Sequence, residues 1–367
     1  MTQVPTGSPL PPTGAGRHTP TPPAVCLGES MAVLTPASRG PLERADTFHR
    51  TAGGAESNVA RGLVALAVPA AWISAVGDDG FGRHLIGELA EAGVDTSAVL
   101  VDPTRPTGLY VKEIGAGDGH PHDLGAGRSR MHYYRGGSAA SALGPALLER
   151  PRAAALLGGA RLVHLTGITA ALSDSCLALL HEILRRRGPG QAVSFDLNWR
   201  EALWRRRDPG VLRPLLDAAD LVLLGADEAT AVLGTAEPAE LRALLPGPRA
   251  IVVKNDARDA TVLERTAGGE VVTTERALSV DVIEPIGAGD AFAAGYLAGE
   301  LRGYDARRRL RLGHIAAAAT LVVPGDHGAP PPPGVVDALL DCPGDAWERT
   351  RVRPDGISSP VLGRLRP

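Results

Sequence analysis

The sequence predicts an α/β protein with a doubly wound, mostly parallel sheet that carries helices on both faces, and with a small β-sheet to one side. Two patterns support this prediction. In the second half of the chain, short apolar runs alternate with helical stretches, which is typical of a parallel sheet covered on both faces. In the first half, residues of about 30–50 and 104–137 look antiparallel, and we expect them to form the small sheet as a lid.

The expected elements follow from hydrophobic periodicity along the chain. Strands fit residues 24–28, 71–76, 107–114, 130–135, 162–165, 192–196, 221–224 and 250–253, and helices fit residues 57–67, 81–92, 177–187, 228–233, 291–301 and 307–323. The strands at 107–114 and 130–135 are expected to pair as a hairpin. The insertion between them, 115–127, contains glycines and histidines, and we interpret it as a mobile loop.

Length and composition indicate one large domain with tails. The chain has 367 residues, of which 44% are hydrophobic, enough to bury a sizeable core. Residues 1–23 are rich in Pro, Thr and Gly and lack the apolar segment of a signal peptide, so we interpret them as a disordered tail. The folded domain is expected to cover residues 24–340, and the polar residues 341–367 are expected to form a flexible C-terminal tail.

Charge and cysteine usage exclude several classes of protein. The formal net charge is −3, so the chain lacks the electrostatic footprint for nucleic acid or an anionic membrane. No apolar run is long enough to span a bilayer. Cys26, Cys176 and Cys342 form no CxxC pair and no zinc spacing, so free thiols in a reducing compartment, and hence a cytoplasmic protein, are expected.

The segment from Glu284 to Phe292 is the most informative one for chemistry. Its Gly-Ala-Gly-Asp, Gly287 to Asp290, permits a tight turn and is followed by small and apolar residues at helical spacing. The amides of this turn would lie at a helix N-terminus, where they attract anions such as a developing phosphoryl charge. Asp290 would be placed to accept a proton from an attacking hydroxyl.

The tetrapeptide alone is a weak signal. Residues 115–118 have the same four letters, but Gly-His-Pro-His follows them and cannot start a helix. An ordinary Asp-capped helix after a tight turn is therefore the simplest interpretation of residues 287–290 taken in isolation. The context of the rest of the chain decides between the two.

That context is a resemblance to the ribokinase-like (PfkB) carbohydrate kinases. Residues 53–60, Gly-Gly-Ala-Glu-Ser-Asn-Val-Ala, resemble the family's sugar-binding glycine motif, and residues 76–82 resemble the stretch that follows it. Residues 287–290 then resemble the family's anion hole and catalytic base. The three motifs occur in the family's order, the resemblance spans about residues 24–340, and the glycine motifs of dinucleotide-binding and P-loop proteins are absent.

The resemblance implies a ribokinase-like fold that uses ATP and Mg²⁺ for in-line phosphoryl transfer to a sugar hydroxyl. Asp290 would be the base, with Gly287, Ala288 and Gly289 lining the anion hole, and Gly53, Gly54 and Asn58 would bind the sugar. Glu284 and Ile286 match the region where the family often holds a monovalent cation. A K⁺ site is therefore possible, although many members have Asp and Thr at those two positions.

Two departures from the family pattern concern the nucleotide. The family's Asn-x-x-Glu motif, linked to metal and phosphate, is present as Gly225 to Glu228, so the Glu is kept and the Asn is not. The family's Gly-x-x-Gly turn beside the phosphates has Asp256 and Asp259 instead, which would repel polyphosphate unless a metal intervenes or the turn faces solvent. Lys254, just before this turn, is assigned to the nucleotide. His314 matches an adenine-edge position or is a helix-surface histidine.

The substrate side resembles 2-keto-3-deoxygluconate kinases in particular. Residues 131–140 resemble the lid segment of that group, residues 195–200 its strand-end motif, and residues 107–110 a further substrate contact. An aromatic ring and an arginine two residues apart on a strand face one side and suit a sugar that carries a carboxylate. The implied substrate contacts are Tyr110, Tyr133, Arg135, Arg200 and, less securely, Asp326.

Other interpretations stay open. Hairpin packing explains Tyr133, and a surface salt bridge explains Arg200, if each is taken alone. The same fold could serve a neutral sugar or a nucleoside, such as fructose, ribose or adenosine, or a sugar-binding protein with weak or lost kinase activity. His120, His122 and His132 are too loosely arranged to predict a metal site, and a solvated loop explains them. The expected partners are the sugar acid and ATP, in a homo-oligomer.

Overall fold

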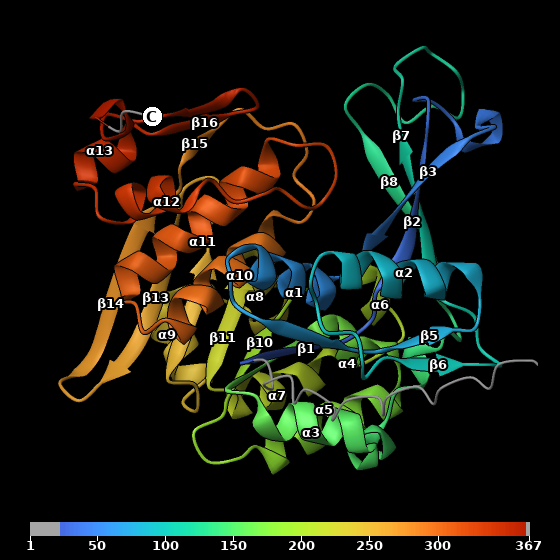
Figure 1. The fold of residues 1–367 in the computed structure, drawn as a ribbon, viewed down its shortest axis with the longest axis horizontal. Coiled ribbons are helices and arrows are strands. Elements are labelled where there is room, and N and C mark those ends of the chain that lie inside the picture. Colours follow the sequence, from blue (N-terminus) through green and yellow to red (C-terminus); the bar gives the residue numbers. More distant parts are fainter. Residues whose placement is uncertain (1–22, 365–367) are drawn as a thin grey trace, which may run out of the picture.

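A computed structural model describes residues 23–364 (Figure 1). Its main body is an eight-stranded sheet in the order β14-β13-β12-β11-β10-β9-β1-β4, and the six strands from β12 to β4 in this order run parallel. The strands are β1 Ala24–Leu27, β4 Ala70–Ile73, β9 Leu162–Thr166, β10 Ala192–Asp196, β11 Leu221–Gly225, β12 Ala250–Lys254, β13 Asp259–Thr266 and β14 Gly269–Arg276. The predicted doubly wound, mostly parallel sheet is confirmed.

Helices cover both faces of this sheet. They are α1 Ala55–Ala65, α2 Gly80–Glu91, α3 Pro151–Gly159, α4 Gly167–Leu172, α5 Asp174–Arg186, α6 Glu201–Trp204, α7 Leu212–Ala218, α8 Ala226–Leu233, α9 Pro238–Leu244, α10 Ala288–Leu301, α11 Ala306–Leu321, α12 Pro333–Leu340 and α13 Gly344–Glu348. One buried core lies under α1, α2, α10 and α11, and the other lies under α3, α5, α7 and α9. The alternating outward and inward side chains of each central strand supply both cores, which is why these strands are apolar throughout.

A separate four-stranded sheet forms the lid and projects from the main body (Figure 1). Its strands are β2 Met31–Pro36, β3 Phe48–Gly53, β7 Leu109–Ile114 and β8 Ser129–Tyr134, in the order β3-β2-β7-β8. β2 and β7 are parallel neighbours, whereas β2–β3 and β7–β8 are antiparallel hairpins. The expected hairpin of residues 107–114 and 130–135 is therefore present, with Tyr110 opposite Tyr133.

The remaining strands form two small sheets. β5 (Ala75–Gly77) pairs with β6 (Leu100–Asp102), and β15 (Ser279–Val280), β16 (Arg351–Arg353) and β17 (Gly356–Ser358) pair near the C-terminus. The β13–β14 hairpin, which extends the main sheet with antiparallel strands, was not expected from the sequence. β14 lies at the edge and exposes most of its side chains, so its apolar pattern is weak.

The expected flexible tail from residue 341 is wrong for the residues up to 364. α13 and the β16–β17 hairpin pack against α11, and Trp347 is only 1% exposed. Its indole Nε1 donates to the carbonyl of Arg276 at 2.8 Å, and the guanidinium carbon of Arg311 lies 4.7 Å from its ring centre. A few isolated apolar residues anchor this segment, and they form no periodic pattern that the sequence could reveal.

The predicted disordered tail, residues 1–23, lies outside the described residues except for Pro23. In the part of the chain that the structure covers, every helix is too short or too polar to cross a membrane.

Candidate active site

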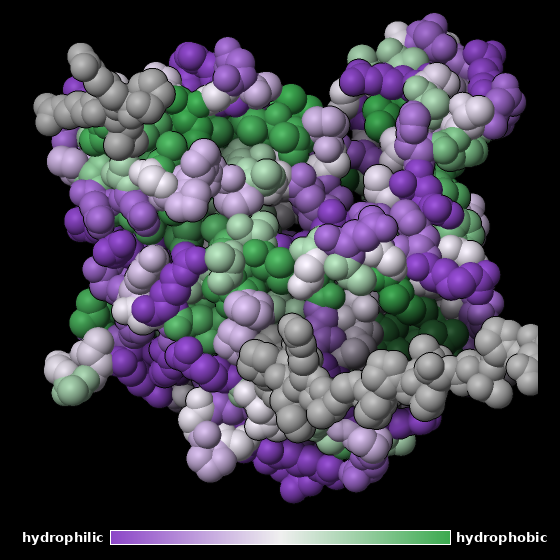
Figure 2. All heavy atoms as spheres, in the orientation of Figure 1, coloured by the Kyte–Doolittle hydropathy of each residue, from purple (hydrophilic) through white to green (hydrophobic). Residues whose placement is uncertain are grey.

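Most of the predicted site residues meet in a cleft of about 520 Å³ between the lid and the main sheet. The cleft lies at the carboxyl ends of the parallel strands, where ligands of open α/β sheets bind. Figure 2 shows a hollow between the projecting lid and the main body. Residues from the lid, α1, α8 and the start of α10 line the cleft, among them Gly53, Gly54, Asn58, Tyr110, Tyr133, Arg135, Arg200, Glu228, Lys254, Gly287, Gly289, Asp290 and Asp326.

Asp290 lies in the first turn of α10 and lines this cleft. Its two carboxylate oxygens accept hydrogen bonds from Asn58 Nδ2 at 2.8 Å and from Asn198 Nδ2 at 3.2 Å. The two amides come from α1 and from the end of β10, 232 and 92 residues away. They hold the carboxylate in one orientation, and among the described residues no cationic side chain is directly bonded to it, so it remains available to accept a proton.

The turn before Asp290 depends on glycine. Gly287 has φ = 81°, in the left-handed region, and a Cβ there would lie 2.4 Å from the carbonyl oxygen of Asp326. The helix N-terminus therefore presents its amides to the cleft with the loop of Asp326 packed directly against it. Such an end of a helix stabilises an anion.

Burial raises the pKa of Asp290 to about 6. A base accepts a proton only when it is ionised, so kcat/KM should fall as the pH drops below about 6, well above the ordinary range for an aspartate. The measurement is kcat/KM from pH 5 to 8, with the coupling enzymes checked separately at each pH. A profile that stays flat down to pH 5 would contradict the assignment of Asp290 as the base.

The glycines of the sugar-side motif allow two segments to come close together. A Cβ on Gly53 would lie 2.7 Å from the Tyr110 hydroxyl, and a Cβ on Gly54 would lie 2.5 Å from the carbonyl oxygen of Glu29. The Tyr110 and Tyr133 rings pack with centres 5.5 Å apart on the lid surface that faces the cleft. These close approaches bring the lid strand β7 over the N-terminus of α1.

Arg135 follows β8 and pairs with a buried carboxylate. Its guanidinium forms an ion pair with Glu29, whose side chain is fully buried and also accepts from Ser138 Oγ at 2.6 Å. The guanidinium carbon lies 5.8 Å from the Tyr133 ring centre. Glu29 thus fixes the arginine and neutralises part of its charge before any ligand enters. No pattern in the sequence singled out Glu29.

Arg200 lies on the opposite side of the cleft, just after β10. Its Nη1 donates to the carbonyl of Trp199 at 2.9 Å and lies 3.7 Å from Glu228 Oε1. Half of its side chain is exposed. The positive charge of Arg200 also lowers the pKa of Asp290, although burial outweighs it. Arg135 and Arg200 therefore face the cleft from the lid and from the main body.

Lys254 and Glu228 form the end of the cleft toward β11 and β12. Lys254 Nζ lies 2.9 Å from Asp196 Oδ2. Burial lowers the Lys254 pKa, but Asp196 and Glu228 outweigh it and raise the pKa overall, so the ammonium is charged. Glu228 accepts the backbone N–H groups of Gly225 at 2.7 Å and Trp199 at 2.9 Å. Gly225, which offers no side-chain amide, contributes only this backbone bond.

Four of the residues assigned to the nucleotide, Gly225, Asp256, Asp259 and His314, do not line the cleft. Asp256 is exposed in the β12–β13 turn with φ = 49°, and Asp259 accepts from Asn255 Nδ2 at 2.6 Å. His314 is 6% exposed, and its ring packs against Phe292 and Trp347 while Nε2 contacts the carbonyl of Glu275 at 3.1 Å. The expectation of a helix-surface histidine is wrong, because α11 turns this position into the core.

Glu284, expected near a cation, already has a cationic partner. Its carboxylate forms an ion pair with Lys112 of the lid strand β7 and accepts the Ile286 N–H at 3.4 Å. Lys112 is 8% exposed. Lys112 and Lys254 are the only lysines of the chain, and both are paired with carboxylates. Lys112 is therefore the cationic partner of Glu284 in the structure, and the ion pair links the lid strand β7 to the segment before α10.

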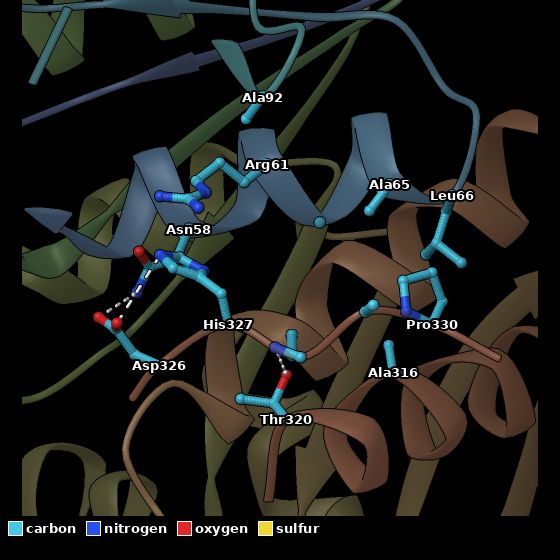
Figure 3. Close-up of a pocket in the computed structure, with 14 residues that line it drawn as sticks. Asn58, Arg61, Ala65, Leu66, Ala92, Ala316, Thr320, Asp326, His327 and Pro330 are labelled. Carbon is cyan, nitrogen blue, oxygen red and sulfur yellow. Dashed lines mark hydrogen bonds and ion pairs between the residues drawn. The ribbon is translucent and has the colours of Figure 1, made fainter. Parts of the chain in front are cut away.

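A smaller cavity of about 270 Å³ lies behind Asn58 and Asp326 (Figure 3). Asn58 and Arg61 of α1 point toward Asp326 and His327 across it, and Asn58 Nδ2 lies 3.5 Å from Asp326 Oδ2. Arg61 is paired with Glu88 at 2.6 Å. Burial raises the pKa of Asp326 and lowers that of His327 to about 4, so this wall of the site carries a neutral histidine.

The sequence interpretation missed two residues beneath Asp290. Asn198, in the left-handed region with φ = 42°, holds the second carboxylate oxygen. Glu56 is fully buried, accepts from Thr166 at 2.7 Å and Thr169 at 2.6 Å, and has a pKa raised to about 7 by burial. Asn198 and Glu56 both lie in motifs that the sequence analysis quoted for other residues. Only the directions of their side chains in the structure show which groups they contact.

Comparison with known proteins finds similarity over most of the chain. The model of the pfkB family carbohydrate kinases matches residues 22–331. The 2-dehydro-3-deoxygluconokinase of Thermoproteus tenax is 36% identical over 325 residues, which cover 86% of this chain and 93% of that protein. The enzyme of the same name from Bacillus subtilis is 32% identical, with 83% and 90% covered. The structure of a fructokinase from Xylella fastidiosa with bound ATP superimposes with a TM-score of 0.71 at 25% identity, covering 86% of this chain and 97% of that one.

Proposed function

The chain belongs to the pfkB family of carbohydrate kinases, and on that premise we propose that it phosphorylates 2-keto-3-deoxygluconate, or a closely related sugar acid, at the expense of ATP. The product would be 2-keto-3-deoxy-6-phosphogluconate. The observation that carries the proposal is the pair of arginines, Arg135 and Arg200, that face one cleft from opposite sides, with Asp290 between the lid and the main sheet. The names of the two curated relatives support the same substrate class.

A charged substrate explains why the cleft needs these arginines. A carboxylate brought into a partly dry cleft is costly unless a fixed cation pairs with it. Arg135 is paired with the buried Glu29, whereas Arg200 lies 3.7 Å from Glu228 with half of its side chain exposed, so Arg200 is the more accessible cation for a substrate carboxylate. A neutral sugar such as fructose would need only partners for its hydroxyl groups and would offer no anion to Arg200.

The proposed reaction is an in-line displacement. The sugar hydroxyl oxygen forms a bond with the terminal phosphorus of ATP, the bond between that phosphorus and the bridging oxygen breaks, and ADP leaves. Asp290 takes the hydroxyl proton as the new bond forms. Asn58 and Asn198 orient the Asp290 carboxylate, and the amides after Gly287 stabilise the charge on the transferred group.

The nucleotide end of the cleft fits a polyphosphate with Mg²⁺. Bound Mg²⁺–ATP supplies the phosphoryl group and neutralises part of its charge. Lys254 would contact the phosphates as a point charge, since its ammonium lies 3.9 Å from where a Cβ on Gly289 would be. Glu228 would hold the metal end, because each of its oxygens accepts only one backbone N–H. We propose no K⁺ site on Glu284, because Lys112 pairs with it.

A panel of sugars in an assay for ADP release tests the proposal. We expect the highest kcat/KM for 2-keto-3-deoxygluconate among a set that includes its galactonate epimer, gluconate, fructose, ribose and adenosine. ATP binding should be measured separately by calorimetry in the absence of sugar, so that no phosphoryl transfer takes place. Preference for a neutral sugar would contradict the substrate class, and absence of nucleotide binding would favour a sugar-binding protein instead.

A further inference from the structure

Three metal-ligating side chains meet at the outer end of the lid, away from the cleft. Glu43 lies in a short 3-10 helix, Leu42–Arg44, between β2 and β3, and His120 and His122 lie in the loop between β7 and β8. His122 Nδ1 lies 2.9 Å from both Glu43 oxygens, and His120 Nε2 lies 3.8 Å from Glu43 Oε1. The three ligand atoms lie within 4.8 Å of one another.

The fold, and not chance contact of side chains, holds these two loops together. β2 and β7 are neighbours in the lid sheet, so the two hairpin tips lie at the same end. Beyond the paired strands, Gly40 N–H donates to the Ile114 carbonyl at 2.8 Å, and Leu42 N–H donates to Glu113 Oε1 at 3.2 Å. These bonds lie within three residues of Glu43 and anchor its backbone to the β7 end.

The histidine loop has its own scaffold. The Asp123 carboxylate accepts the N–H groups of Ala116 at 2.8 Å and Gly117 at 2.7 Å, and Asp118 accepts the His120 N–H at 3.0 Å. Gly117 and Gly119 adopt the left-handed region, with φ of 75° and 79°. The loop, which the sequence suggested to be mobile and solvated, is therefore folded so that both imidazoles turn toward Glu43.

We propose that Glu43, His120 and His122 form a binding site for a divalent transition-metal ion of the Zn²⁺ class. Two imidazoles and one carboxylate form a common zinc ligand set, whereas Mg²⁺ and Ca²⁺ prefer oxygen ligands. Zinc bonds to nitrogen and oxygen of about 2.0–2.2 Å at tetrahedral angles place the ligand atoms about 3.3–3.5 Å apart. The observed separations from Glu43, 2.9 and 3.8 Å, lie on either side of this value.

Histidine and glutamate also form the same contacts as hydrogen bonds without an ion. Affinity for metal is therefore the property that distinguishes a metal site from a hydrogen-bonded cluster. His120 Nδ1 contacts the His122 N–H at 3.2 Å. Coordination through His120 Nε2 requires the proton on Nδ1, so this bond is given up when the metal binds. The fourth coordination position would be open to water, because Glu43 and His122 are exposed.

The inferred role of the ion is structural. None of the three ligands lines the cleft, and the ion would join the tips of the β2–β3 and β7–β8 hairpins. In Figure 2 the visible surface of this outer end of the lid is largely hydrophilic. The proposal does not depend on which sugar the enzyme phosphorylates, and it is tested without any substrate.

The experiment is calorimetric titration of the full chain, carrying no affinity tag and dialysed against chelator, with ZnCl₂ alone. We expect one Zn²⁺ per chain in the wild type, and at least tenfold weaker binding in His122→Ala and Glu43→Gln. His132→Ala is the matched control, since His132 is another lid histidine that faces a carboxylate, Glu113 at 2.7 Å, outside the cluster. It should bind Zn²⁺ as the wild type does, and MgCl₂ should give no binding at this site.

Thermal unfolding with and without ZnCl₂ gives a second readout. Zn²⁺ should raise the Tm of the wild type and of His132→Ala but not that of His122→Ala, and in the absence of metal the three Tm values should be similar. No Zn²⁺ binding by the wild type would overturn the proposal. Unchanged Zn²⁺ affinity in His122→Ala and Glu43→Gln would equally overturn it, because the ion would then bind elsewhere.

Discussion

Asp290→Asn is expected to lower kcat by at least about a hundredfold while leaving substrate binding largely intact. The asparagine keeps the size of the side chain but cannot accept a proton from the sugar hydroxyl. It should also fit the existing hydrogen bonds. Asn58 Oδ1 and Asn198 Oδ1 are buried without partners among the described residues, so either amide can turn to accept from the new Nδ2.

Turnover in the ADP-release assay and sugar affinity by calorimetry measure the two parts of this prediction. The chain supplies a matched control, because Asp118 ends a second Gly-Ala-Gly-Asp that lies in the lid loop. Asp118→Asn removes the same carboxylate from the same local sequence and should leave turnover unchanged. Near-normal turnover in a folded Asp290→Asn protein would show that Asp290 is not the base.

Arg135→Ala and Arg200→Ala should each weaken use of 2-keto-3-deoxygluconate far more than use of fructose. Losing one partner of a buried charge pair costs roughly 2–5 kcal/mol, about thirtyfold to several thousandfold in kcat/KM. Arg200, half exposed, should fall at the lower end of this range. The quantity to measure is the ratio of kcat/KM for the acid to kcat/KM for fructose, in the wild type and in each variant.

Arg135→Ala has a side effect that needs its own control. It leaves the fully buried Glu29 carboxylate without its partner, which would disturb the lid whatever the substrate. The double variant Glu29→Gln/Arg135→Ala removes that charge, and Glu29→Gln alone is its reference. Equal loss of both substrates in the Arg200→Ala and double variants would refute the sugar-acid proposal.

The local structure of residues 287–301 could be predicted well because it depends on contiguous residues. The turn at Gly287 and the helix after it depend on neighbours in sequence, and α10 begins at Ala288, three residues before the expected start at residue 291. The central strands were also found close to their expected positions, because full burial on both faces leaves an apolar run. Edge strand β14 has no such run, because most of its side chains are exposed. The C-terminal segment has none either, because it is buried only at single residues such as Trp347.

The pairings within the site could not be predicted. Glu29 with Arg135, Lys112 with Glu284 and Asn198 with Asp290 join residues that lie from 92 to 172 positions apart. Each pair depends on the face of the strand or helix from which a side chain projects, and on which strands are neighbours. The sequence therefore suggested a cation at Glu284, whereas the fold supplies Lys112 there.

By itself, then, the sequence determined the doubly wound sheet, the Gly-Ala-Gly-Asp turn that opens a helix, and the position of Asp290 in that turn, since these follow from periodicity and backbone sterics within short stretches. Only the tertiary structure decided which charges meet. The two identical tetrapeptides show the difference. Residues 287–290 lie at the cleft, whereas residues 115–118 lie in a lid loop whose histidines face Glu43. Packing between distant segments determines the partners of a polar side chain, and no local pattern encodes that packing.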